Sequence, residues 1–466
     1  MTETGTAGSA EDVHDVVVLG GGSGGYACAL RAAQLGLSVV LVEQDKVGGT
    51  CLHRGCIPTK ALLHSGEVAD AARESEQFGV KATFDGIDMP AVNTYKDSVV
   101  ARLYKGLQGL VKGRGITSVT GTGRLVAPDA VEVDGTTYRG RHVVLASGSV
   151  PRSLPGLQID GARVITSDHA LALDYVPRSA VILGGGVIGV EFASVWKSFG
   201  CDVTIVEALP HLLPLEDEAL SKQLERAYRR RGIGYELGSR FSGVEQTATG
   251  VTVSLEGGKT IDADLLLVAV GRGPVSEGLG YAEQGVQMDR GYVLVDDHCR
   301  TNVPQVYAVG DLIPTLQLAH VGFAEGIFVA EQIAGLAPRP IDYAGVPRVT
   351  YSEPEVASVG LTEAQARERY GESIVTTTYD LAGNGKSQIL KTAGLVKLVA
   401  VPDGPVVGVH LIGSRVSELV AEGQLIVNWE AYAADVAPLL HAHPTQSEAM
   451  GEAHLALAGK PLHAHS

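Results

Sequence analysis

The first apolar run of the chain, Val13-His-Asp-Val-Val-Val-Leu19, leads straight into Gly20-Gly-Gly-Ser-Gly-Gly25. The run predicts a buried strand, the glycines predict a tight turn, and the Ala-rich stretch Tyr26–Leu35 predicts a helix. A second strand is expected over Ser38–Glu43. This part of the sequence therefore predicts a βαβ unit whose second strand ends in a carboxylate.

The same order of elements recurs later in the chain. A strand is expected over Ser179–Leu183, a turn at Gly184-Gly-Gly-Val-Ile-Gly189, a helix over Val190–Phe199 and a strand over Asp202–Glu207. Each copy has a Glu 23 residues after its first glycine (43 − 20 and 207 − 184). One G-x-G-x-x-G is weak evidence in a chain with 59 glycines. The matched repeat predicts two dinucleotide-binding folds, and two βαβ units that bind nothing are the alternative.

Three glycines in each turn have separate physical roles. The first makes the turn, the third lets backbone amides approach a pyrophosphate, and the sixth permits close packing of helix on strand. The Glu would bind ribose hydroxyls. These positions are Gly20, Gly22, Gly25 and Glu43 in the first copy, and Gly184, Gly186, Gly189 and Glu207 in the second. Because Glu207 would repel a 2′-phosphate and Ala208-Leu-Pro210 offers no Arg, the second site should prefer NAD to NADP.

Composition excludes several classes of protein. The chain is 45% hydrophobic and 19% charged, as globular proteins are, and its net charge of −16 would repel a phosphate backbone, so we expect no nucleic-acid partner. No apolar stretch approaches the roughly 18 residues that span a bilayer, and Met1–Asp12 does not read as a signal peptide. We therefore expect a cytoplasmic protein without membrane association. Length and changes of pattern predict domain boundaries near residues 150, 280 and 347.

Two cysteines stand close together in Gly48-Gly-Thr-Cys51-Leu-His-Arg-Gly-Cys56-Ile-Pro-Thr-Lys60. Gly55 gives the backbone the freedom to close a small ring between them. Since a cytosolic chain keeps most thiols reduced, a pair beside a nucleotide site suggests a catalytic disulfide. Zinc is the alternative, but no second pair of Cys or His lies nearby to complete four ligands, so we expect no metal.

Thiol–disulfide exchange also needs a group that accepts the proton of the incoming thiol. In His441-Ala-His443-Pro-Thr-Gln-Ser-Glu448, the imidazole of His443 precedes a Pro-initiated turn, and Glu448 follows five residues later. A base with an orienting carboxylate is one interpretation, and a surface His-Pro turn is the other. In the same way, Val306-Tyr-Ala-Val-Gly-Asp311 predicts either a strand that delivers a carboxylate to a ligand or a plain strand ending in a turn.

Taken in order, these motifs resemble the flavoprotein disulfide reductases of the dihydrolipoamide dehydrogenase type, from about Asp12 to the C-terminus. The family sequence Gly-Gly-Thr-Cys-Leu-Asn-x-Gly-Cys-Ile-Pro-Ser-Lys is matched by Gly48–Lys60. Further segments match in the same order: Ala146-Ser-Gly-Ser149, Ala308-Val-Gly-Asp311, Leu318-Ala-His320, Tyr351-Ser-Glu-Pro-Glu-Val-Ala357 and the His-Ala-His-Pro-Thr that begins at His441.

The resemblance implies an α/β fold with two Rossmann-like dinucleotide-binding domains and a C-terminal α+β dimerisation domain. It implies an FAD-binding domain with the redox disulfide over residues 12–150 and an NAD-binding domain over 151–279. A central domain over 280–347 would return to FAD, and an interface domain would follow over 348–466.

The resemblance also implies roles for single residues. Cys51 would exchange with substrate, Cys56 would lie beside the flavin and form a charge-transfer contact, and Lys60 would pair with Glu191. His443, oriented by Glu448, would be the acid–base group and would come from the partner subunit. The residues implied in binding FAD are Gly20, Gly22, Gly25, Glu43, Gly49, Thr50, Lys60, Ser147, Gly148, Asp311, Ala319 and His320. Those implied in binding NAD are Gly184, Gly186, Gly189, Glu207 and Gly271.

The activity expected from the resemblance is oxidation of dihydrolipoamide, carried on the lipoyl domains of a 2-oxo acid dehydrogenase or glycine cleavage complex, with reduction of NAD by a homodimer. Glutathione, mycothiol and mercuric reductases are alternatives, as is an inactive flavin-binding structural subunit. Resemblance to glutathione reductase would imply the use of NADPH, and the carboxylate of Glu207 disfavours that cofactor. The intact cysteine pair disfavours the inactive subunit. Mercuric reductase adds a C-terminal cysteine pair, whereas Leu462-His-Ala-His-Ser466 has only histidines, which we interpret as a frayed tail rather than a metal site.

The chain departs from the family pattern at a few positions. Thr59 replaces Ser, Ser147 replaces Thr and Ser352 replaces Thr, all mild changes. His53 stands where the family has Asn, between the two cysteines. We expect a solvent-facing side chain there, and an effect on the thiolate or on substrate approach is the alternative.

Overall fold

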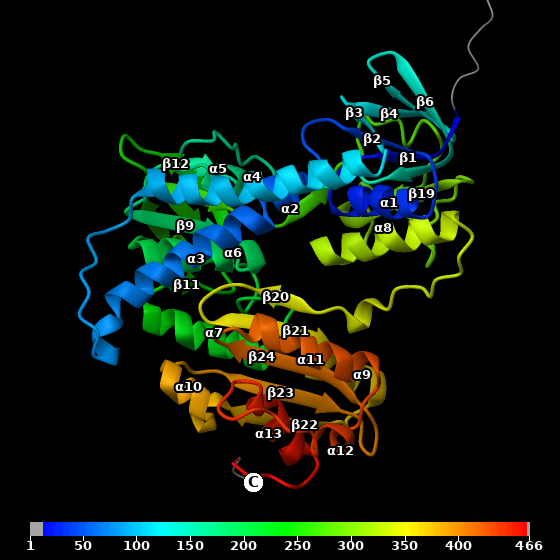
Figure 1. The fold of residues 1–466 in the computed structure, drawn as a ribbon. Coiled ribbons are helices and arrows are strands. Elements are labelled where there is room, and N and C mark those ends of the chain that lie inside the picture. Colours follow the sequence, from blue (N-terminus) through cyan, green and yellow to red (C-terminus); the bar gives the residue numbers. More distant parts are fainter. Residues whose placement is uncertain (1–12, 464–466) are drawn as a thin grey trace, which may run out of the picture. The chain divides into compact units, whose positions relative to one another are not determined.

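The computed structural model describes residues 13–463, so the predictions for Met1–Asp12 and for His465 lie outside the described residues. The chain divides into two compact units, each assembled from segments that are far apart in the sequence (Figure 1). Unit 1 takes Met1–Pro58, Asp97–Val150 and Arg272–Ile341. Unit 2 takes Thr59–Lys96, Pro151–Gly271 and Asp342–Ser466.

Unit 1 is built on a sheet with a parallel centre. The strands lie in the order β3-β2-β1-β6-β5-β4, with β19 also paired to β6. The strand β1 (Val13–Leu19) is an apolar run because Val16, Val17 and Val18 are fully buried, as expected for a parallel strand covered on both faces. The other strands of the sheet are β2 (Val39–Glu43), β3 (Thr117–Thr120), β4 (Gly123–Ala127), β5 (Ala130–Val133), β6 (Thr136–Leu145) and β19 (Val306–Ala308).

Two helices of unit 1, α1 (Ser23–Gln34) and α8 (Ala319–Ile333), pack closely on each other. Glycine makes this approach possible, since a Cβ at Gly326 would lie 2.2 Å from the carbonyl oxygen of Gly24. The remaining elements that begin in unit 1 are α2 (Gly49–Arg54), β7 (Ser149–Pro151), β16 (Arg272–Pro274), β17 (Met288–Asp289), β18 (Tyr292–Val293) and η2 (Gly310–Leu312). The long helices α3 (Cys56–Arg73) and α4 (Met89–Gly113) each have residues in both units.

Unit 2 contains a second parallel sheet, in the order β11-β10-β9-β15-β8. It is formed by β8 (Val164–Ile165), β9 (Ser179–Leu183), β10 (Asp202–Val206), β11 (Gly234–Glu236) and β15 (Leu265–Val268). An antiparallel sheet adds β12 (Phe241–Gln246), β13 (Val251–Leu255) and β14 (Thr260–Ala263). The helical elements of this part are η1 (Ser75–Phe78), α5 (Ser167–Ala170), α6 (Val187–Phe199) and α7 (Glu218–Arg231).

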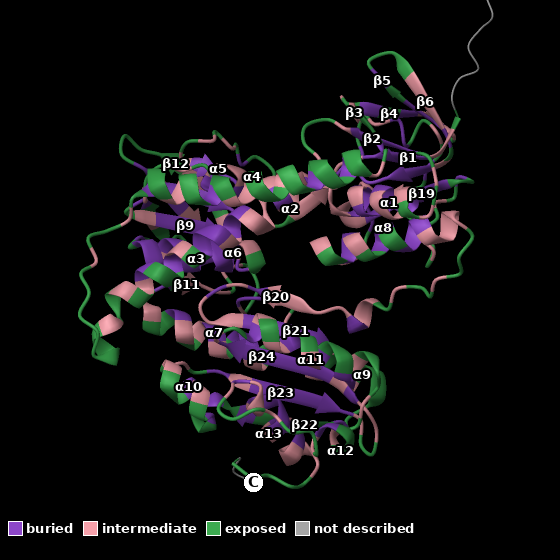
Figure 2. Ribbon diagram, in the orientation of Figure 1, coloured by how far each residue is buried: buried purple, intermediate pink, exposed green. Residues whose placement is uncertain are grey.

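The C-terminal part of unit 2 is an antiparallel sheet in the order β20-β21-β24-β23-β22, buried along much of β23 and β24 (Figure 2). Helix α11 packs on β21 and β24, and α13 packs on β22 and β23. The strands are β20 (Arg348–Thr350), β21 (Glu355–Gly360), β22 (Val375–Asp380), β23 (Leu395–Ala400) and β24 (Val406–Gly413). The helices are η3 (Tyr343–Gly345), α9 (Glu363–Tyr370), η4 (Leu381–Gly383), α10 (Gly385–Leu390), α11 (Val416–Asn428), α12 (Ala433–Val436) and α13 (Glu448–Leu457).

The strands predicted at Val13–Leu19 and Ser179–Leu183 are confirmed, but the helix starts predicted at Tyr26 and Val190 are wrong by three residues. Both helices begin directly after the third glycine of the turn, which is the N-cap and has an extended backbone. The glycine at the sixth position of each turn, Gly25 or Gly189, therefore lies inside the first helical turn, where its missing side chain serves packing. No helix within residues 13–463 is both long and apolar enough to cross a membrane.

Candidate active site

The first glycine-rich turn is sterically restricted at two positions and open at a third. Gly20 has φ +107°, and a Cβ there would lie 2.2 Å from the carbonyl oxygen of Ala146. A Cβ at Gly25 would lie 1.8 Å from the carbonyl oxygen of Gly20, so only glycine fits either position. At Gly22 a Cβ would meet nothing within 4 Å. The N-terminus of α1 therefore faces open space, which fits the pyrophosphate of a dinucleotide.

The second turn repeats this geometry in unit 2. Gly184 has φ +110°, and a Cβ there would lie 2.4 Å from the carbonyl oxygen of Ala269. A Cβ at Gly189 would lie 2.0 Å from the carbonyl oxygen of Gly184, whereas one at Gly186 would meet nothing within 4 Å. The second cradle fits a dinucleotide by the same criteria as the first.

The two acidic residues predicted at the strand ends brace these turns. Oε2 of Glu43 accepts a hydrogen bond of 2.7 Å from the N–H of Gly21, and Oε2 of Glu207 accepts one of 2.6 Å from the N–H of Gly185. The sequence interpretation missed these second glycines, where a Cβ would lie about 3.1 Å from atoms of the Glu side chain. Each carboxylate is thus held beside its turn, where a ribose would be bound.

The cysteine motif is seated on the first turn. The N–H of Gly48 donates a 2.8 Å hydrogen bond to the carbonyl oxygen of Gly21, and a Cβ at Gly49 would lie 2.7 Å from Cα of Gly22. Helix α2, which carries Cys51, starts at this contact. The redox motif and the dinucleotide cradle therefore form one local structure within unit 1.

The two cysteines lie on either side of a break between helices. Cys51 is in α2, Gly55 ends that helix, and Cys56 is the first residue of α3. The partial positive charge of a helix N-terminus favours the thiolate form at Cys56. Burial raises the pKa of Tyr26 to about 12, and the nearby sulfurs of Cys51 and Cys56 act in the same direction. Both cysteines therefore lie near Tyr26 of α1.

Asp311 lies in a polar cluster that closes the predicted flavin site. The hydroxyl of Ser149 donates a 2.5 Å hydrogen bond to Oδ2 of Asp311. Arg272 donates to the hydroxyl of Ser149 (2.8 Å) and its carbonyl oxygen (2.6 Å), and at 3.4 Å to the hydroxyl of Thr50, next to Cys51. The sequence interpretation included the neighbouring Gly271 but missed Arg272. The signal available was an Arg directly after Gly271 and four residues after Val268, the last residue of the buried strand β15.

A buried carboxylate, also missed from the sequence, holds the Gly310–Asp311 segment. Glu325 of α8 is fully buried, and its two oxygens accept hydrogen bonds from the N–H of Gly310 (2.6 Å) and the hydroxyl of Thr315 (2.9 Å). The remaining residues predicted to bind the cofactors have the following environments. Ser147 donates to the carbonyl oxygen of Val275, Gly148 has φ +71°, Ala319 is the first residue of α8, His320 is exposed, and Gly271 accepts from the N–H of Arg152.

The predicted pair of Lys60 and Glu191 is present in unit 2. Nζ of Lys60 lies 2.9 Å from both carboxylate oxygens of Glu191, whose side chain is only 4% exposed. Glu191 also accepts a 2.9 Å hydrogen bond from the N–H of Tyr351, and the Lys60 ammonium lies 4.5 Å from the centre of the Tyr351 ring. The pair thus links α3, α6 and the start of the C-terminal part.

His443 and Glu448 form the predicted dyad. Nδ1 of His443 lies 2.8 Å from Oε1 of Glu448, the first residue of α13, and the His443 side chain is 79% exposed. Burial alone would raise the pKa of Glu448, but hydrogen bonds from the N–H of Thr445 and from His443 lower it. A carboxylate that stays ionised fixes Nδ1 as the protonated nitrogen and leaves Nε2 open to accept a proton.

The expectation that His53 faces solvent is wrong. Its ring is partly buried, with Nε2 3.0 Å from the carbonyl oxygen of Val47 and an edge contact to Tyr104 at a centroid distance of 4.9 Å. His53 and Cys51 are two positions apart on α2, so their side chains point to different sides of the helix. His53 therefore braces the loop before α2.

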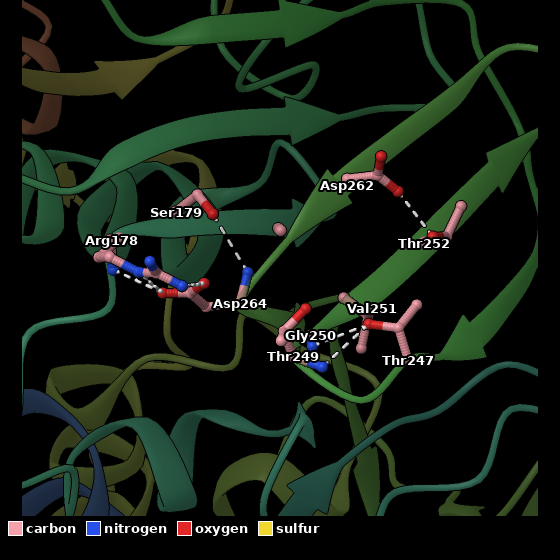
Figure 3. A pocket seen from close by; sticks show the side chains of 10 residues that line it. Arg178, Ser179, Thr247, Thr249, Gly250, Val251, Thr252, Asp262 and Asp264 are labelled. Carbon is pink, nitrogen blue, oxygen red and sulfur yellow. Dashed lines mark hydrogen bonds and ion pairs between the residues drawn. The ribbon is translucent and has the colours of Figure 1, made fainter.

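A pocket of about 410 Å³ in unit 2 (Figure 3) is lined by none of the residues of the second glycine-rich turn. The pocket lining includes Ser179, the first residue of β9. The glycine-rich turn follows the last residue of that strand, at its opposite end. Its polar groups bond one another, as in the contacts of Arg178 with Asp264 and of Thr252 with Asp262.

His463, in the C-terminal segment, is paired with Glu452. Among the described residues, no group of three or more His, Cys, Asp and Glu could hold a metal ion.

Comparisons with known proteins agree with this geometry. Residues 14–326 match the family model described as pyridine nucleotide-disulphide oxidoreductase, and residues 346–454 match the dimerisation domain of the same family. A dihydrolipoyl dehydrogenase of Bacillus subtilis is 41% identical over 97% of this chain and 99% of its own length. A mitochondrial one of Pisum sativum is 39% identical over 98% of this chain and 93% of its own length. The crystal structure of LpdA from Mycobacterium tuberculosis, 28% identical, superposes with a TM-score of 0.89 over 96% of this chain and 100% of that one.

Proposed function

The chain belongs to the pyridine nucleotide-disulphide oxidoreductase family, and on that premise we propose how its residues perform the reaction of a dihydrolipoyl dehydrogenase. It is an FAD-dependent, NAD-linked disulfide oxidoreductase. The observation that carries the proposal is the seating of the cysteine motif on the first dinucleotide turn, through Gly48 on Gly21 and Gly49 on Gly22. This contact brings a thiol pair and a flavin cradle into one structure.

The cysteines perform the exchange with substrate. One thiolate of dihydrolipoamide attacks Sγ of Cys51 and breaks the Cys51–Cys56 bond, while Nε2 of His443 accepts the proton of that thiol. The second substrate thiol then displaces Cys51 and passes its proton to the departing Cys51 sulfur, which closes the lipoamide disulfide and leaves Cys51 as a thiol and Cys56 as a thiolate. The N-terminus of α3 holds Cys56 as the thiolate. When bound, FAD supplies the two-electron carrier between this thiol pair and NAD.

The binding residues have distinct tasks in this proposal. The turn with Gly20, Gly22 and Gly25 binds the FAD pyrophosphate, and Glu43 binds its ribose. Ser147, Gly148, Asp311, Ala319 and His320 surround the rest of the flavin, with Gly49, Thr50 and Lys60 on the cysteine side. The second turn and Glu207 bind NAD, with Gly271 at its edge. We also propose the domain limits 12–150, 151–279, 280–347 and 348–466 for these tasks.

The chain forms a homodimer and acts on lipoamide-related partners. We further propose that His443 and Glu448 serve the cysteine pair of the partner subunit, and that the substrate is carried on lipoyl domains of a 2-oxo acid dehydrogenase or glycine cleavage complex. The cytoplasm is the proposed location. This is supported by the cysteine content of the chain, since five cysteines are too few and too scattered for a structural disulfide framework.

A steady-state assay tests the proposal. The purified yellow protein should reduce NAD with dihydrolipoamide, and should show no comparable activity with oxidised glutathione and NADPH. The glutathione reaction running faster would refute the proposal in favour of another disulfide reductase. No turnover in either assay, with FAD bound to the protein, would favour an inactive structural subunit.

A further inference from the structure

The segment that carries His443 has one side chain that is mostly shielded from solvent. From Pro438 to Pro444, a stretch that the structure describes completely, every residue except His441 is exposed. Leu439 and Leu440 are 58% and 100% exposed, whereas the His441 side chain is only 13% exposed. Two histidines separated by a single residue thus have opposite environments, and the apolar residues beside them do not anchor the segment.

His441 is held by two helices that pack on the C-terminal sheet. Its Nε2 lies 2.8 Å from Oε1 of Glu422 on α11. Its ring lies against Gly451 on α13, where an added Cβ would be 2.6 Å from Nδ1 and 3.0 Å from Cε1. The contact requires glycine at position 451. His441 therefore joins α11 to α13 through a slot that a single methyl group would fill.

The same helix α13 supplies the carboxylate that orients the base. Glu448 binds Nδ1 of His443 and also accepts a 2.7 Å hydrogen bond from the N–H of Thr445. The carbonyl oxygen of Thr445 in turn accepts from the side chain of Asn384 at 2.9 Å. His443 thus lies between an anchor on its C-terminal side, at Thr445, and one on its N-terminal side, at His441.

We propose that His441 and Glu422 are a positioning pair for the acid–base histidine. The pair fixes the backbone two residues before His443 relative to α13, so that Nδ1 of His443 meets Glu448 and Nε2 stays directed at the reacting sulfur. His441 takes no proton from substrate, because Nε2 is engaged by Glu422 and Nδ1 faces the α13 backbone. This inference rests on the proposed function, since it assigns a role relative to His443 as the base.

The slot at Gly451 provides a test that separates positioning from general stability. Gly451→Ala should displace His441 and reduce kcat for dihydrolipoamide oxidation by about tenfold to a hundredfold, because a shift of about 1 Å at a catalytic group has effects of this size. His441→Ala should do the same, and the double variant should be no worse than His441→Ala alone, since the added methyl then has nothing to displace. NADH oxidation by a quinone should be unchanged in all three.

Control variants show how much of each loss of activity is specific to the His441 contact. Gly109→Ala on α4, where a Cβ would meet nothing within 4 Å, should leave both activities unchanged. Glu422→Gln, which can still hydrogen-bond Nε2, should retain more activity than Glu422→Ala. Independent, multiplying losses from Gly451→Ala and His441→Ala would overturn the proposal, as would equal losses of the lipoamide and quinone activities, or variants within twofold of the wild type.

A substrate-free measurement distinguishes failure of this inference from failure of the proposed function. In spectra of protein labelled with 15N-histidine, with His443 assigned by its absence in His443→Gln, the wild type should show the tautomer protonated at Nδ1. His441→Ala and Gly451→Ala should show averaged tautomers. An unchanged tautomer in both would overturn the positioning role. A wild type inactive with dihydrolipoamide would refute the proposed function, and the spectra would still decide whether His441 orders His443.

Discussion

Oε2 of Glu207 accepts a hydrogen bond of 2.6 Å from the N–H of Gly185, the second glycine of the turn that it closes. Oε1 of the same side chain accepts a second one, of 2.8 Å, from the N–H of Leu209. The carboxylate is therefore fixed at the strand end by backbone donors on both sides. Its charge is placed where the ribose 2′ position of a bound dinucleotide would lie.

Cofactor choice should follow from this fixed charge. The wild type should favour NADH over NADPH by at least about tenfold in kcat/KM, or about 1.4 kcal/mol, because the carboxylate repels a 2′-phosphate. Glu207→Gln should narrow that ratio. Glu43→Gln, its counterpart in the first turn, is the control, and should weaken FAD retention without changing the ratio. Equal kcat/KM for the two nucleotides in the wild type would contradict the assignment.

The two cysteines should differ in their optical signatures. Cys51→Ser should keep FAD and show a long-wavelength absorbance band near neutral pH, because the proposed role of Cys56, at the N-terminus of α3, is that of a thiolate beside the flavin. Cys56→Ser should lack the band. The measurement is a visible spectrum of each variant over a pH titration. A band in Cys56→Ser and none in Cys51→Ser would reverse the roles.

Replacing Lys60 alone should destabilise the fold more than replacing Lys60 and Glu191 together. Lys60→Met leaves a carboxylate that is only 4% exposed without its cation, which should lower the free energy of unfolding by about 3–5 kcal/mol. Adding Glu191→Gln to that variant should restore part of the loss. Urea midpoints at fixed protein and FAD concentrations measure both. A double variant less stable than Lys60→Met would show that the carboxylate is stabilised by something other than Lys60.

Stability should depend on pH through Glu353. Burial raises the pKa of Glu353 from 4.5 to about 7, the carboxylates of Glu355, Glu67 and Asp70 act in the same direction, and Arg231 opposes them. Between pH 4.5 and 7 the folded chain holds a proton that the unfolded chain releases, so this contribution to stability declines as pH rises through that window. The free energy of unfolding of Glu353→Gln relative to that of the wild type, measured by urea unfolding, should therefore increase from pH 5 to pH 8, with a change on the order of 3 kcal/mol as the upper bound. A difference independent of pH would contradict the assignment.

Loss of the base should separate the two half-reactions. His443→Gln should slow dihydrolipoamide oxidation by about a hundredfold or more, because it removes the imidazole proposed to accept the proton of the thiol. NADH oxidation by a quinone needs no such proton transfer and should persist. Glu448→Gln should slow the first reaction less, since an amide can still orient Nδ1. Equal slowing of both reactions by His443→Gln would indicate a structural role.

Much of the fold could be predicted because its signals are local. Val13–Leu19 and Ser179–Leu183 are apolar runs followed directly by glycines, and the positive φ of Gly20 and Gly184 is a property of the backbone turn itself. The close spacing of Cys51 and Cys56, and of His443 and Glu448, also lies within short segments. Such patterns are readable since the residues that cooperate are neighbours in the chain.

The first residues of the two helices and the environment of His53 could not be predicted from neighbouring residues in the sequence. The Ala-rich run suggested a start at Tyr26, but the helix begins at Ser23, because Gly22 already caps it. His53 was expected in solvent, yet Tyr104, far away in the sequence, provides an edge contact for its ring. A side chain's surroundings depend on which distant segment packs on it, and no spacing rule specifies that.

The sequence by itself determined the two dinucleotide turns, the thiol pair and the histidine dyad, because the residues of each lie within 23 positions of one another in the chain. Only the tertiary structure decided that Arg272 joins Ser149 to Thr50, that Glu325 holds Gly310, and that His441 is clasped between Glu422 and Gly451. These contacts join segments up to 222 positions apart, and they exist because burying the sheets and helices brings polar groups together that must then satisfy one another.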